Sequence, residues 1–514
     1  MRPRFRRGGG ASSLVKQFAL FFIGGFVSLP LLGAEQADRC TPPNFPLPEF
    51  GSARFNVRDF GATGDGRTND TVAINKTIDQ SNGSGGGDVI FPAGTYLAAS
   101  IHLKSNVRFL LDKDAVITGA KSGYDAPEPN AFEQYQDFGH SHFHDALMWG
   151  DNIENFAIVG GRVNGGHIIE ADPDNRDIGD KLISIKNSRN LLFENITHET
   201  GGHFVYLLNG CENITMANVT VKKSRDGVNF VGCRNVQLHD CRFTGCGDDT
   251  VALKSDWALG RKARSENIYV WDSYFESACN ALQFGSETAG DFRNINFWNV
   301  GIGRAGKAGI GITSADGGVI DGVNYRDITI KGAACPIFMR ITDRLRSGDP
   351  DKKRGAIKNI KIANLIVTNS QLGEKGWPRT CAITGLPGSP LENITLENVK
   401  IVYRGGGKKL FDGGSPLPEE TPTKKLGPLP ASGFYIREAK EITFRNVEVA
   451  FESVDPRPVI LAVNVEGFVL EEFSARTASG GQRLRLKRIG NLSVRNCPGL
   501  QERDGETVPS LLEE

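Results

Sequence analysis

Two adjacent aspartates, Asp248 and Asp249, stand immediately before a short apolar run in the segment GCGDDTVALKS. A third, Asp226, precedes a similar run in SRDGVNFVG. Carboxylates that a fold brings together raise the pKa of at least one of them, which gives a protonated acid beside an ionised base. Acid/base cleavage of a glycosidic bond requires such a pair. The same residues are also compatible with plain turns or with a calcium site, because aspartate is common in turns and supplies oxygen ligands to calcium.

A repeat along the chain predicts the element that carries these aspartates. Segments such as NLLFENI and NITMANV open with asparagine and then alternate apolar and polar residues; they begin at Asn190, Asn213, Asn235, Asn267, Asn294, Asn359 and Asn393, with looser copies near Gly322, Glu441, Gly467 and Asn491. Alternation with period two predicts a strand with one buried face. A strand that recurs after a little over twenty residues predicts a solenoid. We therefore expect an all-β chain folded as a right-handed parallel β-helix; leucine-rich repeats share the period, but their leucine spacing and helical segment are absent.

Register along the repeat relates the aspartates to other polar residues. Counting thirteen residues from successive repeat asparagines reaches His203, Asp226, Asp248, Asn280 and Lys307. Equivalent positions on neighbouring coils lie about 4.8 Å apart. These side chains are therefore predicted to form one column, with Asp249 one step beyond Asp248. Solenoid columns are usually filled by like residues that stack, so this mixed polar column favours a catalytic cluster.

The stretch before the repeats predicts a lid on the solenoid. TNDTVAINKTID has the pattern of a short amphipathic helix with Thr68 or Asn69 near its N-cap, and the open end of a solenoid needs a polar cover. The whole chain is predicted to comprise a signal peptide over 1–34, a linker over 35–54, a β-helix catalytic domain over 55–500 and a frayed polar tail over 501–514.

The N-terminus has the pattern of an export signal. MRPRFRRGGG is basic, FALFFIGGFVSLPLLGA is apolar but short for a membrane span, and small residues follow near Ala34. A retained membrane anchor is the alternative. We predict a secreted or periplasmic protein that does not contact the membrane after the signal is removed.

Composition limits the partners. The 60 basic and 60 acidic residues leave a formal net charge of zero, which argues against a nucleic-acid-binding surface. A β-helix needs no partner for its stability, so we expect a monomer, with no cofactor and no metal. The partner expected is a polysaccharide substrate.

Cysteine and histidine give weaker signals. Nine cysteines include no C-x-x-C pair, which disfavours zinc, and the odd number leaves at least one thiol unpaired or bridged to another chain. The segment HSHFHDALMWG holds three of the eight histidines at alternate positions. Metal ligation is one interpretation of that segment. We favour a loop at the edge of a cleft, with Phe143 or Trp149 against a sugar ring.

The segment SRDGVNFVGCRNVQLHDCRFTGCGDDTVALKS, Ser224–Ser255, resembles the polygalacturonases of glycoside hydrolase family 28. The resemblance extends over about 55–330, and its specific part is the RDG…GDDTVALKS…GS core. It implies hydrolysis that inverts the anomeric centre, in which Asp248 protonates the leaving glycosidic oxygen while Asp226 and Asp249 activate water. An inverting site needs about 6.5–9.5 Å between acid and base, to admit that water.

Two family motifs are missing. Asn280 stands where the histidine of G-H-G falls, and Gly311 and Thr313 stand where R-I-K has its cations. In the family those cations bind a galacturonate carboxylate, so either the acid group is met differently here or the substrate is not a plain homogalacturonan. The residues that could bind substrate instead are Lys307, Asn280, Lys254 and His203, with Arg340 as a further cation. Solvated surface charge is the ordinary alternative for each of the basic residues.

Together these features predict an exported hydrolase that cleaves an α-linked galacturonate-containing (pectic) or related acidic polysaccharide. Insertions near 125–145, 256–264 and 343–355 could close the cleft, which favours exo action. Two alternatives share the fold. One is a β-elimination lyase, which would usually need calcium and a basic residue at the reaction centre; the other is a non-catalytic carbohydrate-binding β-helix.

Overall fold

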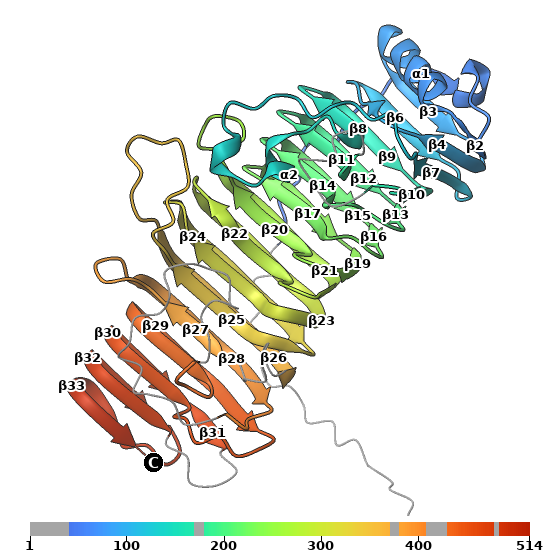
Figure 1. The fold of residues 1–514 in the computed structure, drawn as a ribbon. Helices are drawn as coiled ribbons and strands as arrows, with labels where there is room; N and C mark the ends of the chain where they lie inside the picture. The colour runs from blue at the N-terminus through green and yellow to red at the C-terminus, as the bar shows by residue number, and fades with distance from the viewer. Residues whose placement is uncertain (1–40, 169–178, 371–379, 408–428, 477–482, 514) are drawn as a thin grey trace, which may run out of the picture. The chain divides into compact units, whose positions relative to one another are not determined.

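The computed structural model describes residues 41–168, 179–370, 380–407, 429–476 and 483–513. From Pro42 onward these residues form one compact unit, in which strands from successive coils pair side by side (Figure 1). All of the pairings between named strands are parallel except the last one. The predicted all-β parallel β-helix is therefore confirmed, while its right-handed sense stays a prediction. The predicted signal peptide lies outside the described residues.

The strands make three faces. The first, here called the cleft face, carries the aspartates and consists of β5 (Ile101–His102), β8 (Ala146–Asp151), β11 (Lys181–Lys186), β14 (Phe204–Asn209), β17 (Asp226–Val231), β20 (Val251–Ser255), β22 (Leu282–Thr288), the end of β23 (Phe292–Ser314), β25 (Ala333–Ile341), β27 (Cys381–Thr384) and the starts of β29 (Phe434–Phe451), β30 (Ile460–Glu471) and β32 (Leu484–Arg495), whose later residues lie on the second face.

The second face, here called the asparagine face, holds the repeat segments. Its strands are β1 (Arg54–Asn56), β3 (Gly87–Phe91), β6 (Val107–Leu111), β9 (Glu154–Val159), β12 (Arg189–Glu194), β15 (Glu212–Ala217), β18 (Arg234–His239), β21 (Ser265–Ser277), β23, β24 (Val319–Ile330), β26 (Ala356–Ser370), β28 (Leu391–Tyr403) and β29. The third face begins with β2 (Asp65–Asn69), β4 (Gly94–Ala98), β7 (Ala115–Gly119), β10 (Arg162–Asn164), β13 (Thr197–His198), β16 (Thr220–Val221) and β19 (Arg242–Cys246), continues in the later halves of the long strands, and includes β31 (Ser474–Arg476).

The repeat asparagines form a ladder at the turn into the asparagine face. Each side-chain amide donates to the asparagine of the preceding coil at 2.8–3.0 Å, through Asn106, Asn155, Asn190, Asn213, Asn235, Asn267 and Asn294. All of them have positive φ, a conformation that asparagine tolerates better than most residues. The looser copies at Gly322, Glu441, Gly467 and Asn491 have positive φ as well. The alternating apolar residues after each asparagine point inward and make one continuous buried core.

The N-terminal helix is present. Helix α1 (Thr71–Gly83) follows the short 3₁₀ helix η1 (Val57–Phe60) and buries Ile74 and Ile78 against the first coils. Its role as a lid stays a prediction. The end of the predicted linker contacts the solenoid, because the Phe45 and Tyr269 rings lie 6.0 Å apart. Within the residues that the structure describes, neither α1 nor α2 (Phe138–Ser141) is long and apolar enough to span a membrane.

The C-terminal tail is not frayed, and that prediction was wrong. Residues Arg503–Glu513 form β33, which pairs antiparallel with β32. An edge strand leaves a row of backbone N–H and C=O groups unpaired, and a returning strand satisfies them. The composition of the tail could not predict this pairing, because the pairing depends on the exposed edge of β32 and not on the tail sequence. Of the nine cysteines, the eight within the described residues are buried free thiols.

Candidate active site

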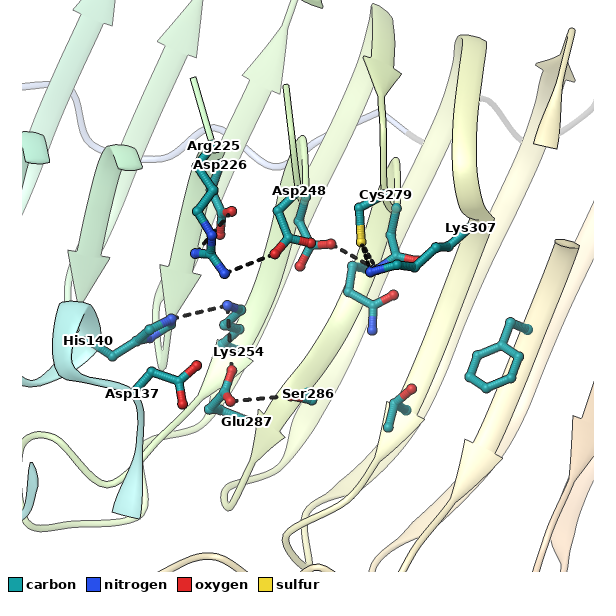
Figure 2. Close-up of a pocket in the computed structure, with 15 residues that line it drawn as sticks. Asp137, His140, Arg225, Asp226, Asp248, Lys254, Cys279, Ser286, Glu287 and Lys307 are labelled. Atoms are coloured by element: carbon teal, nitrogen blue, oxygen red, sulfur yellow. Dashed lines mark hydrogen bonds and ion pairs between the residues drawn. The ribbon is translucent and has the colours of Figure 1, made fainter. Parts of the chain in front are cut away.

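A cleft of about 230 Å³ opens on the cleft face (Figure 2). It is lined by Asp137, His140, Arg225, Asp226, Asp248, Asp249, Lys254, Cys279, Asn280, Gln283, Ser286, Glu287, Lys307, Thr313 and Phe338. The structure thus brings together the predicted residues Asp226, Asp248, Asp249, Lys254, Asn280 and Lys307. His203 is not among the lining residues.

An extra residue in one coil brings the three aspartates together. Residues of the Asp226 coil pair with residues of the next coil that are 22 positions later before Asp248, as Ser224 does with Cys246. After Asp249 the separation is 23 positions, as between Val228 and Val251. Asp248 and Asp249 therefore both lie opposite Asp226. The Asp248 N–H donates to the Arg225 carbonyl at 2.8 Å, and the Gly227 N–H donates to the Asp249 carbonyl at 2.9 Å. A bulge of this kind redirects side chains, and here it aims two neighbouring carboxylates into one cleft.

The single polar column predicted from the sequence is in fact two adjacent rows. One row runs through Phe204, Asp226, Asp249, Asn280 and Ala308. The other runs through His203 and Arg225 before the bulge and continues, after it, through Asp248, Cys279 and Lys307. Counting from the asparagines failed because coils differ by one residue between the asparagine turn and the cleft, and a slip of one residue changes which side chains share a row.

Arg225 is a site residue that the sequence analysis missed. Its guanidinium donates to Asp248 Oδ2 at 2.9 Å and lies 3.5 Å from Asp226 Oδ1 (Figure 2). It also donates to His203 Nε2. Burial, together with the Arg225 charge, holds the pKa of His203 well below its usual range, so this nitrogen is an acceptor. His203 therefore helps to position the Arg225 guanidinium by accepting its hydrogen bond. The available signal was an arginine directly before Asp226, within the RDG part of the segment that carries the resemblance.

The three carboxylates differ in their environments. Burial, reinforced by the charges of Asp248 and Asp226, raises the pKa of Asp249 to about 8. Burial also raises the pKa of Asp226, whose Oδ2 accepts from Asn229 at 3.0 Å. Burial alone would raise the pKa of Asp248 too, but the Cys279 thiol and the charge of Arg225 outweigh it and hold this pKa below its usual value. The cleft thus keeps Asp249 protonated and Asp248 ionised at neutral pH.

Asn280 and Lys307 complete the two rows. The Asn280 amide donates to Asp249 Oδ1 at 2.8 Å, and its own oxygen accepts from the Ala308 N–H at 3.1 Å. The Lys307 ammonium donates to the Cys279 sulfur at 2.7 Å. Within the described residues, no carboxylate lies in salt-bridge range of that ammonium. Lys307 is therefore a cation at the cleft that makes no direct salt bridge among these residues. Burial would lower its pKa, but the Cys279 thiol and the nearby charge of Asp248 outweigh burial and raise it.

Lys254 and Glu287 form the floor of the cleft. The Lys254 ammonium lies 3.4 Å from Glu287 Oε2 and 3.2 Å from the His140 Nε2 nitrogen (Figure 2). Both side chains are almost wholly buried. Burial would raise the pKa of Glu287, but Lys254 and Arg344 outweigh it and keep this carboxylate ionised. Glu287 is therefore a buried anion of the site.

Three insertions meet beside the cleft, although they are far apart in sequence. Arg346 donates to Asp137 at 3.2 Å and to Glu287 at 2.6 Å, and so joins the third insertion to the first. Asn130 of the first insertion donates to the carbonyl of Ala258 in the second at 3.0 Å. The short 3₁₀ helix η2 (Glu133–Tyr135) and α2 lie in the first insertion. Together the insertions 125–145, 256–264 and 343–355 form what we call the wall.

A row of side chains along the cleft face shows where the cleft ends. This central row runs through Leu207, Asn229, Ala252, Gln283, Gly311, Phe338 and Ala382. Leu207 belongs to a buried apolar cluster with Phe143 and Ala258 of the wall. At the other end, Phe338 and Ala382 belong to a second buried cluster that includes Leu429. Apolar packing therefore bounds the cleft on both sides along the coil axis.

One group of side chains has the spacing of metal ligands. Within the described residues, ligand atoms of Asp248, Asp249 and Cys279 lie within 4.8 Å of one another. Calcium prefers an all-oxygen set, which the thiol does not supply, and the Lys307 ammonium donates to the same sulfur. The donor set therefore does not match the calcium site considered from the sequence.

The fold and site define a parallel β-helix protein with a carboxylate cleft, and comparisons with known proteins show which proteins the chain resembles. Residues 54–274 match the family model "Rhamnogalacturonase A/epimerase, pectate lyase-like". A probable polygalacturonase from Vitis vinifera is 23% identical over 389 residues, 68% of this chain and 75% of that protein. A plasmin and fibronectin-binding protein A from Streptococcus pneumoniae is 30% identical over 243 residues, 44% of this chain but 32% of that protein.

Solved structures agree on the fold. The family 28 exopolygalacturonase from Yersinia enterocolitica has a TM-score of 0.55 at 16% identity, covering 89% of this chain and 79% of that one. The polygalacturonase from Erwinia carotovora has a TM-score of 0.50 at 19% identity, covering 71% and 96%. The protein is polygalacturonase-like and is similar to glycoside hydrolase family 28.

Proposed function

We propose that this protein is a glycoside hydrolase that cleaves an α-linked galacturonate-containing (pectic) or related acidic polysaccharide by inverting acid/base hydrolysis. The observation that carries the proposal is the bulge that places Asp248 and Asp249 opposite Asp226 at one cleft. We further propose that the protein is secreted or periplasmic and acts as a monomer without a cofactor. Its proposed partner is the polysaccharide substrate. The polygalacturonase relatives support the pectic substrate.

The proton balance of the cleft supports a division of roles. Asp249, with its raised pKa, holds a proton at neutral pH, and Asp248 beside it is ionised. A substrate carboxylate bound at Lys307 would neutralise part of the positive charge near Asp248 and so raise the pKa of Asp248. In this proposal the proton of Asp249 then passes to Asp248, which donates it to the leaving oxygen and leaves Asp249 ionised. Asp226 and Asp249 act as the base that activates water.

The boundaries of the cleft support exo action. A polysaccharide cleaved internally must pass through a groove that is open at both ends. Here the apolar clusters at Leu207 and Phe338 bound the central row, and the wall stands beside it. The substrate would therefore present a chain end to the cleft from above.

A non-catalytic binding solenoid is the second candidate. The match to the plasmin and fibronectin-binding protein A favours it, since that protein is named for binding. The ionised and protonated carboxylates at one bulge favour the hydrolase, because a surface that only binds sugar hydroxyls needs no such pair.

The test is an incubation of residues 35–514 with pectic and other acidic polysaccharides, following new reducing ends and ultraviolet absorbance together. Hydrolysis yields reducing ends without absorbance, whereas a lyase yields an unsaturated, absorbing product. The Asp248→Asn variant should lose about 10²–10⁴-fold in turnover while still binding the product. Unchanged turnover in that variant would remove these carboxylates from the mechanism. Binding without turnover in the parent protein would favour the binding solenoid.

A further inference from the structure

Cys279 lies in the cleft between Asp248 and Lys307, and its sulfur contacts both. The Lys307 ammonium donates to the sulfur at 2.7 Å (Figure 2), and the Asn280 amide donates to it at 3.3 Å. Because these two donors occupy the sulfur as an acceptor, its own S–H is left to donate elsewhere. The acceptor is the Asp248 carboxylate, which is hydrogen-bonded to the thiol.

Backbone contacts on both sides hold the thiol in this place. The Cys279 N–H donates to the Ser277 hydroxyl at 2.7 Å, and that hydroxyl donates to the carbonyl of Asp248. The Lys307 N–H in turn donates to the Cys279 carbonyl at 2.7 Å. Cys279 is therefore tied to the coil of Asp248 and to the coil of Lys307. The contact between the thiol and the carboxylate is thus fixed by the pairing of neighbouring coils.

The thiol is suited to donating a hydrogen bond and not to attacking a substrate. Burial, reinforced by the charges of Asp249 and Asp248, raises the pKa of Cys279, so the thiol keeps its proton at neutral pH. A cysteine nucleophile acts as the thiolate and needs a lowered pKa. A thiol that accepts from an ammonium becomes a better donor, because hydrogen bonds in a chain polarise one another. Here the chain runs from Lys307 through Cys279 to Asp248.

Other charged groups face Asp248 from every element around it. They come from the preceding coil, from the bulge, from the floor of the cleft and from a following coil: Arg225, Asp226, Asp249, Lys254 and Lys307. Arg225 has its own hydrogen bond to Asp248, at 2.9 Å. Lys307 has no salt bridge to Asp248, and the group hydrogen-bonded to both of them is the Cys279 thiol. Cys279 therefore provides the direct connection between this cation and this carboxylate.

We propose that Cys279 is a positioning residue for the acid of the site: its thiol accepts from Lys307, donates to Asp248, and so orients the Asp248 carboxylate and keeps it ionised until substrate binds. A substrate group that draws the Lys307 ammonium away from the sulfur weakens this donation. Asp248 then takes up the proton of Asp249 more readily. This inference rests on the proposed function and names the residue that couples binding to proton transfer in the same site.

Infrared spectroscopy tests the contact without turnover. In each background, the S–H stretching band of Cys279 is isolated as the difference that Cys279→Ala produces. The band should lie at lower frequency than that of Cys497, a buried thiol that donates to backbone carbonyls at 3.5 and 3.3 Å. Asp248→Asn and Lys307→Met should each move the Cys279 band to higher frequency. A band that neither variant moves would overturn the proposal.

The pH profile of kcat/KM tests the consequence for proton transfer. Cys279→Ala should move the limb that belongs to Asp248 to higher pH, because the ionised carboxylate loses a donor, and Cys279→Ser should restore most of the shift. Lys307→Met should move the same limb in the same direction. In the double variant the shift should be smaller than the sum of the two single shifts, since both changes remove one shared interaction. Cys497→Ala is the matched control and should leave the limb in place.

The outcomes separate this inference from the function on which it rests. Additive shifts, or a limb that Cys279→Ala leaves in place while turnover continues, would overturn the role of Cys279 and leave the proposed hydrolase standing. A parent protein that hydrolyses no polysaccharide in the panel would overturn the proposed function and, with it, the part of Cys279 in proton transfer.

Discussion

The Arg225 guanidinium donates to the Asp248 carboxylate at 2.9 Å, across two neighbouring coils. The same guanidinium also donates a hydrogen bond to the neutral His203 ring. After the Cys279 hydrogen bond, Arg225 is therefore the next contributor that holds the pKa of Asp248 below its usual value. Its removal provides a direct test of the proton balance in the cleft.

Burial raises the pKa of Asp248, and the Cys279 hydrogen bond and the Arg225 charge lower it. Arg225→Gln removes that charge. We expect the pKa of Asp248 to rise, so the limb of the pH profile of kcat/KM that belongs to Asp248 should move to higher pH. The measurement is kcat/KM from pH 3 to 10 for the parent and the variant. Arg234→Gln, which alters an exposed pair with Glu212, is the control and should leave the profile in place.

Asp249→Asn should change how stability depends on pH. The folded-state pKa of Asp249 is about 8, above the value of an unfolded aspartate. A raised pKa contributes stability that is fully present below about pH 4 and is lost as pH rises through about 8. The variant carries no ionisable group at this position. The melting temperature of the variant should therefore rise relative to that of the parent as pH rises from 4 to 9. Asp59→Asn on the surface should show no such trend, and a parallel pH dependence of parent and variant would contradict the buried-acid assignment.

Arg346→Ala should loosen the wall. Arg346 bridges Asp137 and Glu287 between two insertions, and Glu287 keeps Lys254 and Arg344 as partners after the change. We therefore expect folding to survive and the products to shift from chain-end units toward internal fragments. Chromatography of early products measures this shift. An unchanged product pattern would mean that the apolar ends of the cleft alone enforce exo action.

Arg344→Met should be costly to stability. Arg344 makes a two-nitrogen contact with Asp316, a fully buried carboxylate, and also binds Ser286. Without the guanidinium, the Asp316 charge is left buried with only backbone donors, which costs about 3–5 kcal/mol. Denaturant unfolding of the variant measures the loss. The exposed Arg445–Glu471 pair provides the comparison, and Arg445→Met should cost about 0–1 kcal/mol.

Local pattern was enough to predict much of the fold. The alternation after each repeat asparagine identified strands, and the asparagine itself marked a turn that recurs in every coil, so the parallel β-helix followed from short segments. The C-terminal tail was mistaken for a frayed end because its partner strand, β32, is not encoded in the tail itself.

The sequence by itself determined three acids of the site, Asp226, Asp248 and Asp249, but not Asp137 or Glu287. Asp226 begins a cleft-face strand, and Asp248 and Asp249 stand just before the next one, a relationship that is local along the chain. Only the tertiary structure decided what surrounds them. One inserted residue set which side chains share a row, and Arg346 came to Asp137 from 209 residues away. Packing between coils decides the pairing register and the contacts between distant loops. The spacing of residues within one coil therefore cannot predict them.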